Sequence, residues 1–378
     1  MYEGRIIDID LHHRWKNENE LIQFVEPEWR HLLERPTSEV HIEAPVQVFF
    51  HITGINKRMD AFGPQGEVPG SDYETTRAQW LDAYPVDRAV LSYDIGDIAG
   101  VPNPYLATAL CRAANNWSFE TWIERPRDPR LYMAGLIPTQ IPSDGVAEIQ
   151  RCAENPRIVE ALLISNGLGK PFGHPAYHDL YAAAQDCGLP IAMHNGGDLW
   201  HGTTHGTAGG VPHTRFEFHT TSPQHSMSHL ASFIVHGVFE KFPKLKLLVI
   251  EGGVAWLPWL MWSLDRHYES LRRESPLVKR LPSEYIREHV RVSSQPLEVS
   301  DDRDQLIELL EAAGGIEDML VFASDYPHWD SDDPAYISRR LPRAWHEKVF
   351  HDNALDLLRW PDDPGEQARE ADRMPATA

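Results

Sequence analysis

The sequence has few cysteines and no long apolar run. Its three cysteines, Cys111, Cys152 and Cys187, are odd in number and widely spaced among 378 residues. This spacing argues against a disulfide framework or a cysteine zinc site, so we expect buried thiols. No apolar stretch reaches the about 18 residues that suggest a membrane span, and no membrane association is expected. The start, MYEGRIIDID, lacks the basic and apolar regions of a signal peptide, which predicts a cytoplasmic protein.

Positive charge is also scarce. The 35 Lys and Arg residues against 56 Asp and Glu residues give a formal net charge of −21. A field of this sign repels phosphate backbones, so we expect no nucleic-acid partner. A small-molecule substrate that is itself anionic must then be met by a local basic patch or by a metal ion. The 42% of hydrophobic residues suffices for a full core.

Eight short apolar runs alternate with segments of helical spacing, which predicts a parallel sheet covered on both faces. Eight such units in one chain favour an α/β protein with a (β/α)8 barrel, the TIM barrel. A doubly wound open sheet is the alternative, but no glycine-rich phosphate fingerprint follows the first run. The predicted strands are Arg5–Leu11, Arg88–Tyr93, Leu131–Ile137, Ile158–Ile164, Leu189–His194, Lys246–Glu251, His289–Ser294 and Met319–Ser324.

Two connections are longer than ordinary barrel loops. Residues 15–73, after the first strand, are polar and predict a cap insertion. Residues 195–244, after the fifth strand, are rich in His and aromatic residues and predict a lid. We expect one domain over residues 1–360, followed by a flexible tail at 361–378.

Acidic and histidine side chains stand at four of the predicted strand ends. In a parallel barrel these ends share one mouth, where the chemistry takes place. A mixed set of imidazoles and carboxylates suits Zn, Fe or Mn. One strand-end Asp alone often caps a helix, and one His alone is more often a core residue, so the prediction rests on their combination. The residues are Asp10, His12, His194, Glu251 and Asp325, with His328 close behind the last.

The lid segment supplies further candidates. His219 and His229 border its helical part, and we expect them to act as extra metal ligands or proton carriers. Aromatic residues there and after the sixth strand predict an apolar wall for a substrate, although helix packing is the alternative for Trp256. These residues are Trp200, Phe216, Phe218 and Trp256.

Three stretches carry a family resemblance: IIDIDLHHRW, HGVFEKFPKLKLLVIEGGVAWLPWLMWSLD and VFASDYPHWDSDDP. They resemble the amidohydrolase-related, metal-dependent TIM-barrel family, in the branch that includes aromatic-acid decarboxylases. The resemblance implies that Asp10, His12, His194 and Asp325 are metal ligands, and it makes a homodimer possible. Two positions depart from the family pattern. Asp10 stands where His-x-His is usual, and Glu251 stands where decarboxylase relatives carry a catalytic His. Both departures replace imidazole by carboxylate, which favours a hard-metal or dinuclear centre.

Two functions follow from this resemblance. The sequence also resembles the non-haem diiron hydroxylases of platensimycin-type diterpenoid biosynthesis. This similarity predicts a monooxygenase with two Fe ions that uses dioxygen to hydroxylate a bulky apolar substrate, such as a diterpenoid acid or its thioester. The alternative is a hydrolase or decarboxylase of a carboxylic acid with one Zn or Mn ion. His328, His229 and Glu251 are the predicted catalytic residues.

Overall fold

The computed structural model describes residues 2–33, 56–164, 166–194, 210, 212, 214–298, 300 and 302–361. Its eight strands pair in the order β1 to β8, and every neighbouring pair is parallel. The N–H groups of Ile9 and His12 donate to the carbonyls of Phe322 and Tyr326, which joins the first strand to the segment that directly follows the last strand and closes the barrel. The strands are β1 Ile6–His13, β2 Val86–Tyr93, β3 Leu131–Leu136, β4 Ile158–Leu163, β5 Ile191–His194, β6 Leu247–Ile250, β7 Val290–Ser293 and β8 Leu320–Val321.

Each predicted apolar run overlaps one of these strands, which confirms the predicted TIM barrel. The strands are apolar on both sides because one face fills the barrel and the other is covered by helices. In β1 every residue of IIDIDLHH is buried, including its two Asp and two His residues. The observed strands end within a few residues of the predicted bounds, and β8 is the shortest.

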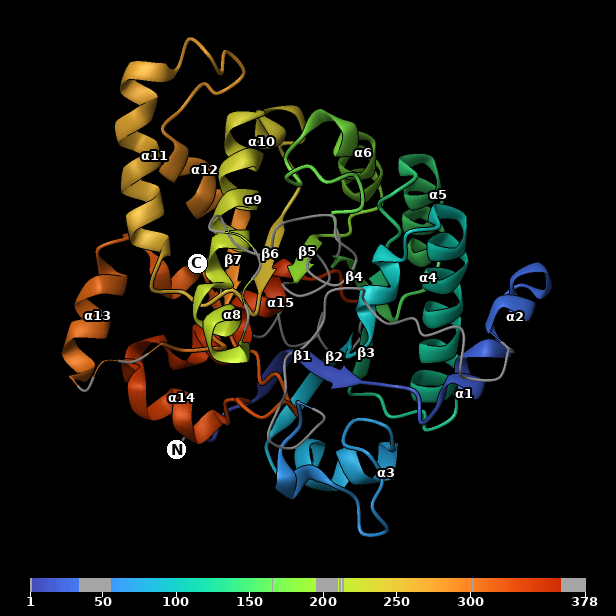
Figure 1. Cartoon of the computed structure of the whole chain (residues 1–378). Coiled ribbons are helices and arrows are strands. Elements are labelled where there is room, and N and C mark those ends of the chain that lie inside the picture. Colours follow the sequence, from blue (N-terminus) through green and yellow to red (C-terminus); the bar gives the residue numbers. More distant parts are fainter. Residues whose placement is uncertain are drawn as a thin grey trace, which may run out of the picture.

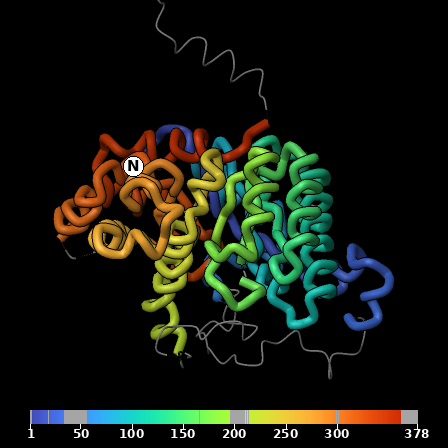
Figure 2. The backbone as a smooth tube through the Cα atoms, turned by 90° about the horizontal axis from the view of Figure 1, so that it is seen from above, coloured from blue at the N-terminus to red at the C-terminus, as the bar shows by residue number. Residues whose placement is uncertain are grey.

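Helices surround the strands on the outside (Figures 1 and 2). Helices α4, α5 and α6 lie side by side on one flank (Figure 1). The helical part of the segment before β6 is divided into two helices, because Gly237 adopts a left-handed φ of 64° between them. The main helices are α3 Tyr73–Thr76, α4 Pro104–Ser118, α5 Pro142–Ala153, α6 His178–Asp186, α9 Pro223–Val235, α10 Val238–Lys241, α11 Leu257–Leu271, α12 Pro282–His289, α13 Arg303–Glu311, α14 Pro334–Arg340 and α15 Asn353–Leu357.

Parts of both predicted insertions belong to the described residues. The first contributes α1 Glu18–Ile22, α2 Pro27–Leu33 and a 3-10 turn at Met59–Ala61, and the second contributes α8 Arg215–Thr221, α9 and α10. Residues 34–55 and 195–209 lie outside the described part, as do residues 362–378, which make up most of the predicted tail. No helix in the described ranges combines the length and apolar character needed to cross a membrane.

Candidate metal centre

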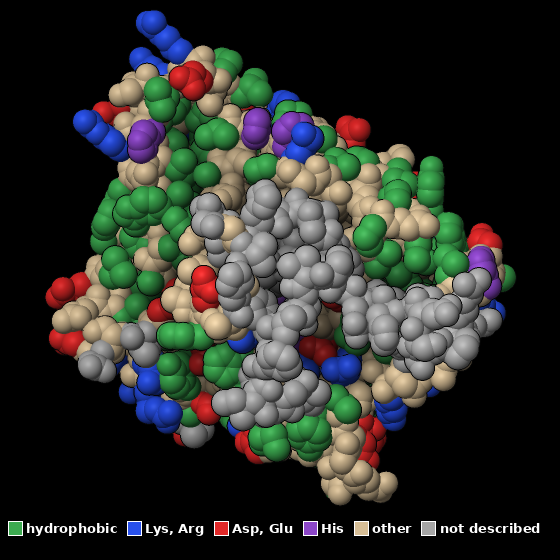
Figure 3. Space-filling model, in the orientation of Figure 1, with side chains coloured by type: hydrophobic (Ala, Val, Ile, Leu, Met, Phe, Trp, Pro, Cys, Tyr) green, Lys and Arg blue, Asp and Glu red, His purple; other side chains and the backbone are tan. Residues whose placement is uncertain are grey.

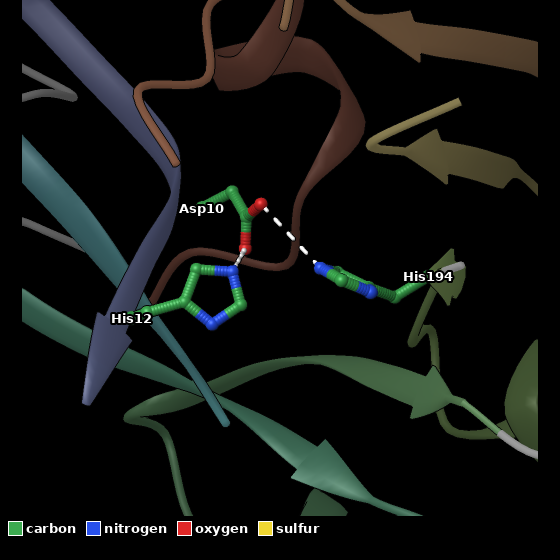
Figure 4. Close-up of side chains that lie close together, drawn as sticks. All are labelled: Asp10, His12 and His194. Atoms are coloured by element: carbon green, nitrogen blue, oxygen red, sulfur yellow. Dashed lines mark ion pairs between the residues drawn. The ribbon is translucent and has the colours of Figure 1, made fainter. Parts of the chain in front are cut away.

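The ends of β1 and β5 bring three predicted ligands together. Asp10 and His12 are two residues apart on β1, so both side chains point into the barrel, and His194 is the last residue of β5. Figure 4 shows the three side chains directed toward one another. The Asp10 carboxylate lies 3.4 Å from His12 Nε2 through Oδ1 and 3.7 Å from His194 Nε2 through Oδ2.

The end of β8 adds a second, overlapping group. Asp325 Oδ1 lies 3.1 Å from His12 Nε2, and His328 Nδ1 contacts the same carboxylate oxygen. Within each group, Asp10–His12–His194 and His12–Asp325–His328, the possible ligand atoms all lie within 4.8 Å of one another. The structure therefore assembles residues from three strands that the sequence separates by more than a hundred positions.

The chemistry of this cluster fits a metal ion. Both carboxylate oxygens of Asp10 and both ring nitrogens of His12 are buried and make no hydrogen bond within the described part of the chain. Buried polar atoms without partners are costly, and a cation among them removes that cost. Neutral imidazoles and carboxylates are ligands suited to Zn, Mn and Fe.

The charges of the cluster support the same conclusion. Burial raises the pKa of Asp10, but the interactions with the His12 and His194 rings together outweigh burial and lower this pKa. Burial likewise opposes ionisation of Asp325, but the neighbouring His328 and His12 rings lower the pKa of this carboxyl. Both carboxyl groups are therefore carboxylates at neutral pH, the form that binds a cation.

Glu251 connects this cluster to further polar groups. Glu251 Oε2 lies 3.2 Å from His194 Nε2, and Glu251 Oε1 lies 3.9 Å from His219 Nε2. His219 Nε2 also lies 3.1 Å from Asp330 Oδ2. Gln295 Nε2 donates to Asp325 Oδ2 at 3.1 Å and is 3.4 Å from Asp330 Oδ2. His219 and Glu251 thus lie beside the cluster, and their roles as metal ligands or proton carriers stay predictions. Asp330 is an acidic neighbour that sequence reasoning missed.

The other predicted residues are placed less closely. His229 is buried on α9, where its Nδ1 accepts a hydrogen bond from the Phe172 N–H at 3.0 Å and its ring packs on Phe172. Neither converging group contains His229, and its role as a ligand or proton carrier stays a prediction. Trp200 lies outside the described residues.

The predicted apolar wall is only partly buried. Phe218 is buried on α8, but Phe216 is 84% exposed. Trp256 Nε1 donates to the carbonyls of Gly252 and Gly253 at 2.7 and 2.9 Å, so this ring holds the turn after β6. Apolar side chains gather over α11 in Figure 3, a helix on which Trp259 and Trp262 are about half exposed. The role of Phe216, Phe218 and Trp256 as a wall of the substrate pocket remains a prediction.

Asp94, with the cations Arg14 and Lys57 around it, lies beside His328 and was missed by sequence reasoning. His328 Nε2 lies 2.9 Å from Asp94 Oδ1, and the Arg14 guanidinium donates to Asp94 Oδ2 at 3.0 Å. The buried Lys57 ammonium contacts the same carboxylate. Burial opposes the charge on Asp94, but Lys57 and His328 lower its pKa well below the usual range. Asp94 directly follows β2, so the strand-end rule that found the other residues applies to it as well.

Glu160 is a further residue that sequence reasoning missed. It lies in the middle of β4 and is fully buried, and neither carboxyl oxygen has a hydrogen-bond partner among the described residues. Burial, with the charge of Asp10 acting across the barrel interior, raises the pKa of Glu160 well above its ordinary value. The signal was available, because a charged residue inside an otherwise apolar strand is unusual.

Known proteins resemble the chain over most of its length. The family model described as Amidohydrolase matches residues 9–360. A γ-resorcylate decarboxylase of Rhizobium sp. (strain MTP-10005) is 23% identical over 304 residues, covering 76% of this chain and 88% of the relative. A γ-resorcylate decarboxylase of Rhodococcus jostii (strain RHA1) is 22% identical over 311 residues, with the same two coverages of 76% and 88%.

Solved structures share the fold at low identity. An amidohydrolase from Mycobacterium avium subsp. paratuberculosis K-10 superposes with a TM-score of 0.71 at 21% identity, covering 97% of this chain and 100% of the other. The 5-carboxyvanillate decarboxylase of Novosphingobium aromaticivorans, complexed with manganese and a nitrobenzoic acid, gives a TM-score of 0.64 at 17% identity, covering 93% and 95%. None of these relatives is named as a diiron hydroxylase, so the predicted two Fe ions and dioxygen gain no support from them.

Proposed function

Because the chain belongs to the amidohydrolase family, we propose that it is a metal-dependent decarboxylase that acts on a carboxylic acid. The observation that carries the proposal is the convergence of Asp10, His12, His194 and Asp325 at one barrel mouth. The buried ligand atoms of Asp10 and His12 have no hydrogen-bond partner among the described residues. The γ-resorcylate decarboxylases among its relatives support this reaction class. A hydrolase with the same metal ligands is the alternative, and the test below distinguishes a decarboxylase from a hydrolase.

The four residues would hold one divalent ion, Mn²⁺ or Zn²⁺. When bound, such an ion polarises a substrate carboxylate or lowers the pKa of a water molecule. His328 lies between Asp325 and Asp94 and is placed to move a proton at this site. Burial disfavours the charged ring, but the Asp325 carboxylate outweighs burial and raises the pKa of His328 above its ordinary value. The ring therefore holds a proton more tightly than an ordinary histidine does, and it is placed to donate that proton to a carbanion-like centre as CO₂ departs.

In the proposal, Arg14 and Lys57 help an anionic substrate to approach the site. They place two cations around Asp94 at the same barrel mouth, although the whole chain carries a net charge of −21. These two cations offset the charge of Asp94, which lowers the local repulsion of an anionic substrate.

The test combines metal analysis with an assay under two atmospheres. Purified protein is loaded with Mn²⁺ or Zn²⁺ and offered 2,6-dihydroxybenzoate and 5-carboxyvanillate, the acids named for its structural relatives. We expect one metal ion per chain and CO₂ release that is equal in air and under argon and is lost in Asp325→Ala. Release of an acid and an alcohol or amine from an ester or amide panel, without CO₂, would instead assign a hydrolase.

A diiron hydroxylase is the second candidate, and one observation favours it. Glu251, His219 and Asp330 form a carboxylate-rich group directly beside His194, as a second metal site requires. Two Fe per chain together with oxygen consumption, and no CO₂ release under argon, would support this function and contradict decarboxylation.

A further inference from the structure

A cavity of about 220 Å³ lies at the same end of the barrel as the metal centre. Apolar side chains form most of its wall, among them Trp15, Leu21, Ile98 and Leu110, and the half-buried Ile22 also lines it. These residues come from the segment after β1, from α1, from the 3-10 turn Gly96–Gly100 and from α4. None of the residues of the two converging metal groups lines this cavity.

Two cations and one carboxyl group also line the cavity. Arg14 uses Nη1 to bind Asp94 Oδ2 at 3.0 Å, and a guanidinium has five N–H donors, so further donors remain for an anion. Lys16 is exposed at the rim, with Nζ 3.7 Å from Asp72 Oδ1. The negative charge of Asp97 would repel a bound anion. Burial and the charge of Asp94 raise the pKa of Asp97 to about 6, so this repulsion weakens in mildly acidic solution.

The Asp94 carboxylate links a residue of the cavity wall, Arg14, to His328 beside the metal centre. Arg14 binds one oxygen of Asp94, while His328 lies 2.9 Å from the other. Asp94 therefore lies between His328 and the cavity, which is next to the ends of β1 and β2.

We propose that this cavity is a binding site for an organic carboxylate with an apolar body the size of a ring system. The apolar body packs on Trp15 and Leu110, and the carboxylate meets Arg14 and Lys16. An apolar cavity of about 150 Å³ holds benzene, so the volume seen here accepts a larger, substituted or fused ring. The proposal does not depend on the proposed reaction, because it names a site outside the metal ligands.

The test uses 2-naphthoate as the ligand and metal-free protein. Binding is measured by isothermal titration calorimetry, with 2-naphthalenemethanol as the neutral analogue. Ile22→Trp fills part of the cavity, and Lys16→Gln removes a rim charge without touching the core. The matched controls are Ile307→Trp, at a half-buried position on α13, and Lys244→Gln, at an exposed position before β6.

We expect 2-naphthoate to bind more tightly than the neutral analogue. Ile22→Trp should weaken binding at least about tenfold, as expected when a ligand loses the space it fills. Lys16→Gln should weaken it by about threefold, the scale of an exposed charge contact. Both control variants should bind like the wild type.

Three results would overturn the proposal: unchanged affinity in Ile22→Trp and Lys16→Gln, equal affinity for the neutral analogue, or binding that appears only after Mn²⁺ is added. The last result would place the carboxylate on the metal instead. Because binding is measured without metal, a failure of the decarboxylase assay leaves this test intact. In Mn²⁺-loaded protein, strong paramagnetic broadening of the naphthoate protons identifies the site as part of the substrate pocket, and weak broadening identifies a separate effector site.

Discussion

Glu251 and Asp325 share a left-handed backbone conformation at the ends of their strands. Their φ angles are 52° and 56°, and they follow β6 and β8. The conformation brings Glu251 Oε2 to 3.2 Å from His194 Nε2 and Asp325 Oδ1 to 3.1 Å from His12 Nε2. A residue other than glycine is strained there by about 1–3 kcal/mol, and such strain clusters at functional sites. The barrel thus accepts local strain at two strand ends that direct carboxylates into one site.

The strain at Glu251 predicts an unusual order of stabilities. Glu251→Gly should be more stable than Glu251→Ala by about 1 kcal/mol, because glycine adopts a positive φ without a Cβ penalty. Urea unfolding of the metal-free variants measures the difference. Equal free energies of unfolding would show that the backbone at this position relaxes in solution.

The metal centre predicts loss of metal without loss of fold. His12→Ala, His194→Ala and Asp325→Ala should each bind less than a tenth of the wild-type metal, as measured by elemental analysis after dialysis. Circular dichroism should remain like that of the wild type. His267→Ala is the matched control, since His267 is exposed on α11. Full metal content in any of the three would remove that residue from the ligand set.

Glu251 separates one metal ion from two. Glu251→Gln keeps the size of the side chain but removes its charge. If the group of Glu251, His219 and Asp330 holds a second metal ion, the metal content of Glu251→Gln falls from two ions to one and turnover is lost. If only one ion is bound, the metal content stays at one and turnover alone falls, as expected for a residue that acts on a proton beside the metal. Unchanged metal content with unchanged turnover would contradict both roles.

Glu160 predicts a stabilising substitution inside the barrel. Its carboxyl group is fully buried without a hydrogen-bond partner among the described residues, so Glu160→Leu should raise the free energy of unfolding by about 1–3 kcal/mol. Glu160→Gln retains a buried polar group and should gain much less. Chemical denaturation at neutral pH compares the variants. A loss of stability in Glu160→Leu would reveal a partner of this carboxyl in solution.

Asp332 predicts a pH dependence of stability. Burial raises the pKa of Asp332 to about 7, helped by the charge of Asp330 and opposed by a hydrogen bond from the Leu297 N–H. An unfolded Asp has a pKa of about 3.9, so the folded state binds the proton more tightly. The stabilisation from this proton is fully present below about pH 4 and is lost as the pH rises through about 7.

The measurement compares the wild type with Asp332→Asn by urea unfolding. Between about pH 5 and pH 8 the free energy of unfolding of the wild type should fall by roughly 2–3 kcal/mol relative to the variant. Using the difference between the two proteins removes the repulsion that the net charge of −21 adds at high pH. A constant difference would show that Asp332 titrates normally.

The sequence alone determined the barrel and the end at which the site lies. Eight β-branched, apolar runs separated by helical segments can bury both faces only as a covered parallel sheet. The same pattern placed Asp10, His12, His194 and Asp325 at strand ends, and the structure brings these residues together. The strand-end rule would also have found Asp94, since it depends on position along a strand and on nothing distant.

Only the tertiary structure decided which groups meet across strands. The approach of Asp330 to His219, the placing of His328 between Asp94 and Asp325, and the packing of His229 on Phe172 depend on loop paths between distant segments. The closed barrel likewise decided that Glu160 is buried near the charge of Asp10 and that Gly237 divides the helix before β6. Periodicity records which face of an element is buried, but distances between side chains on different elements arise only when the chain packs into one core.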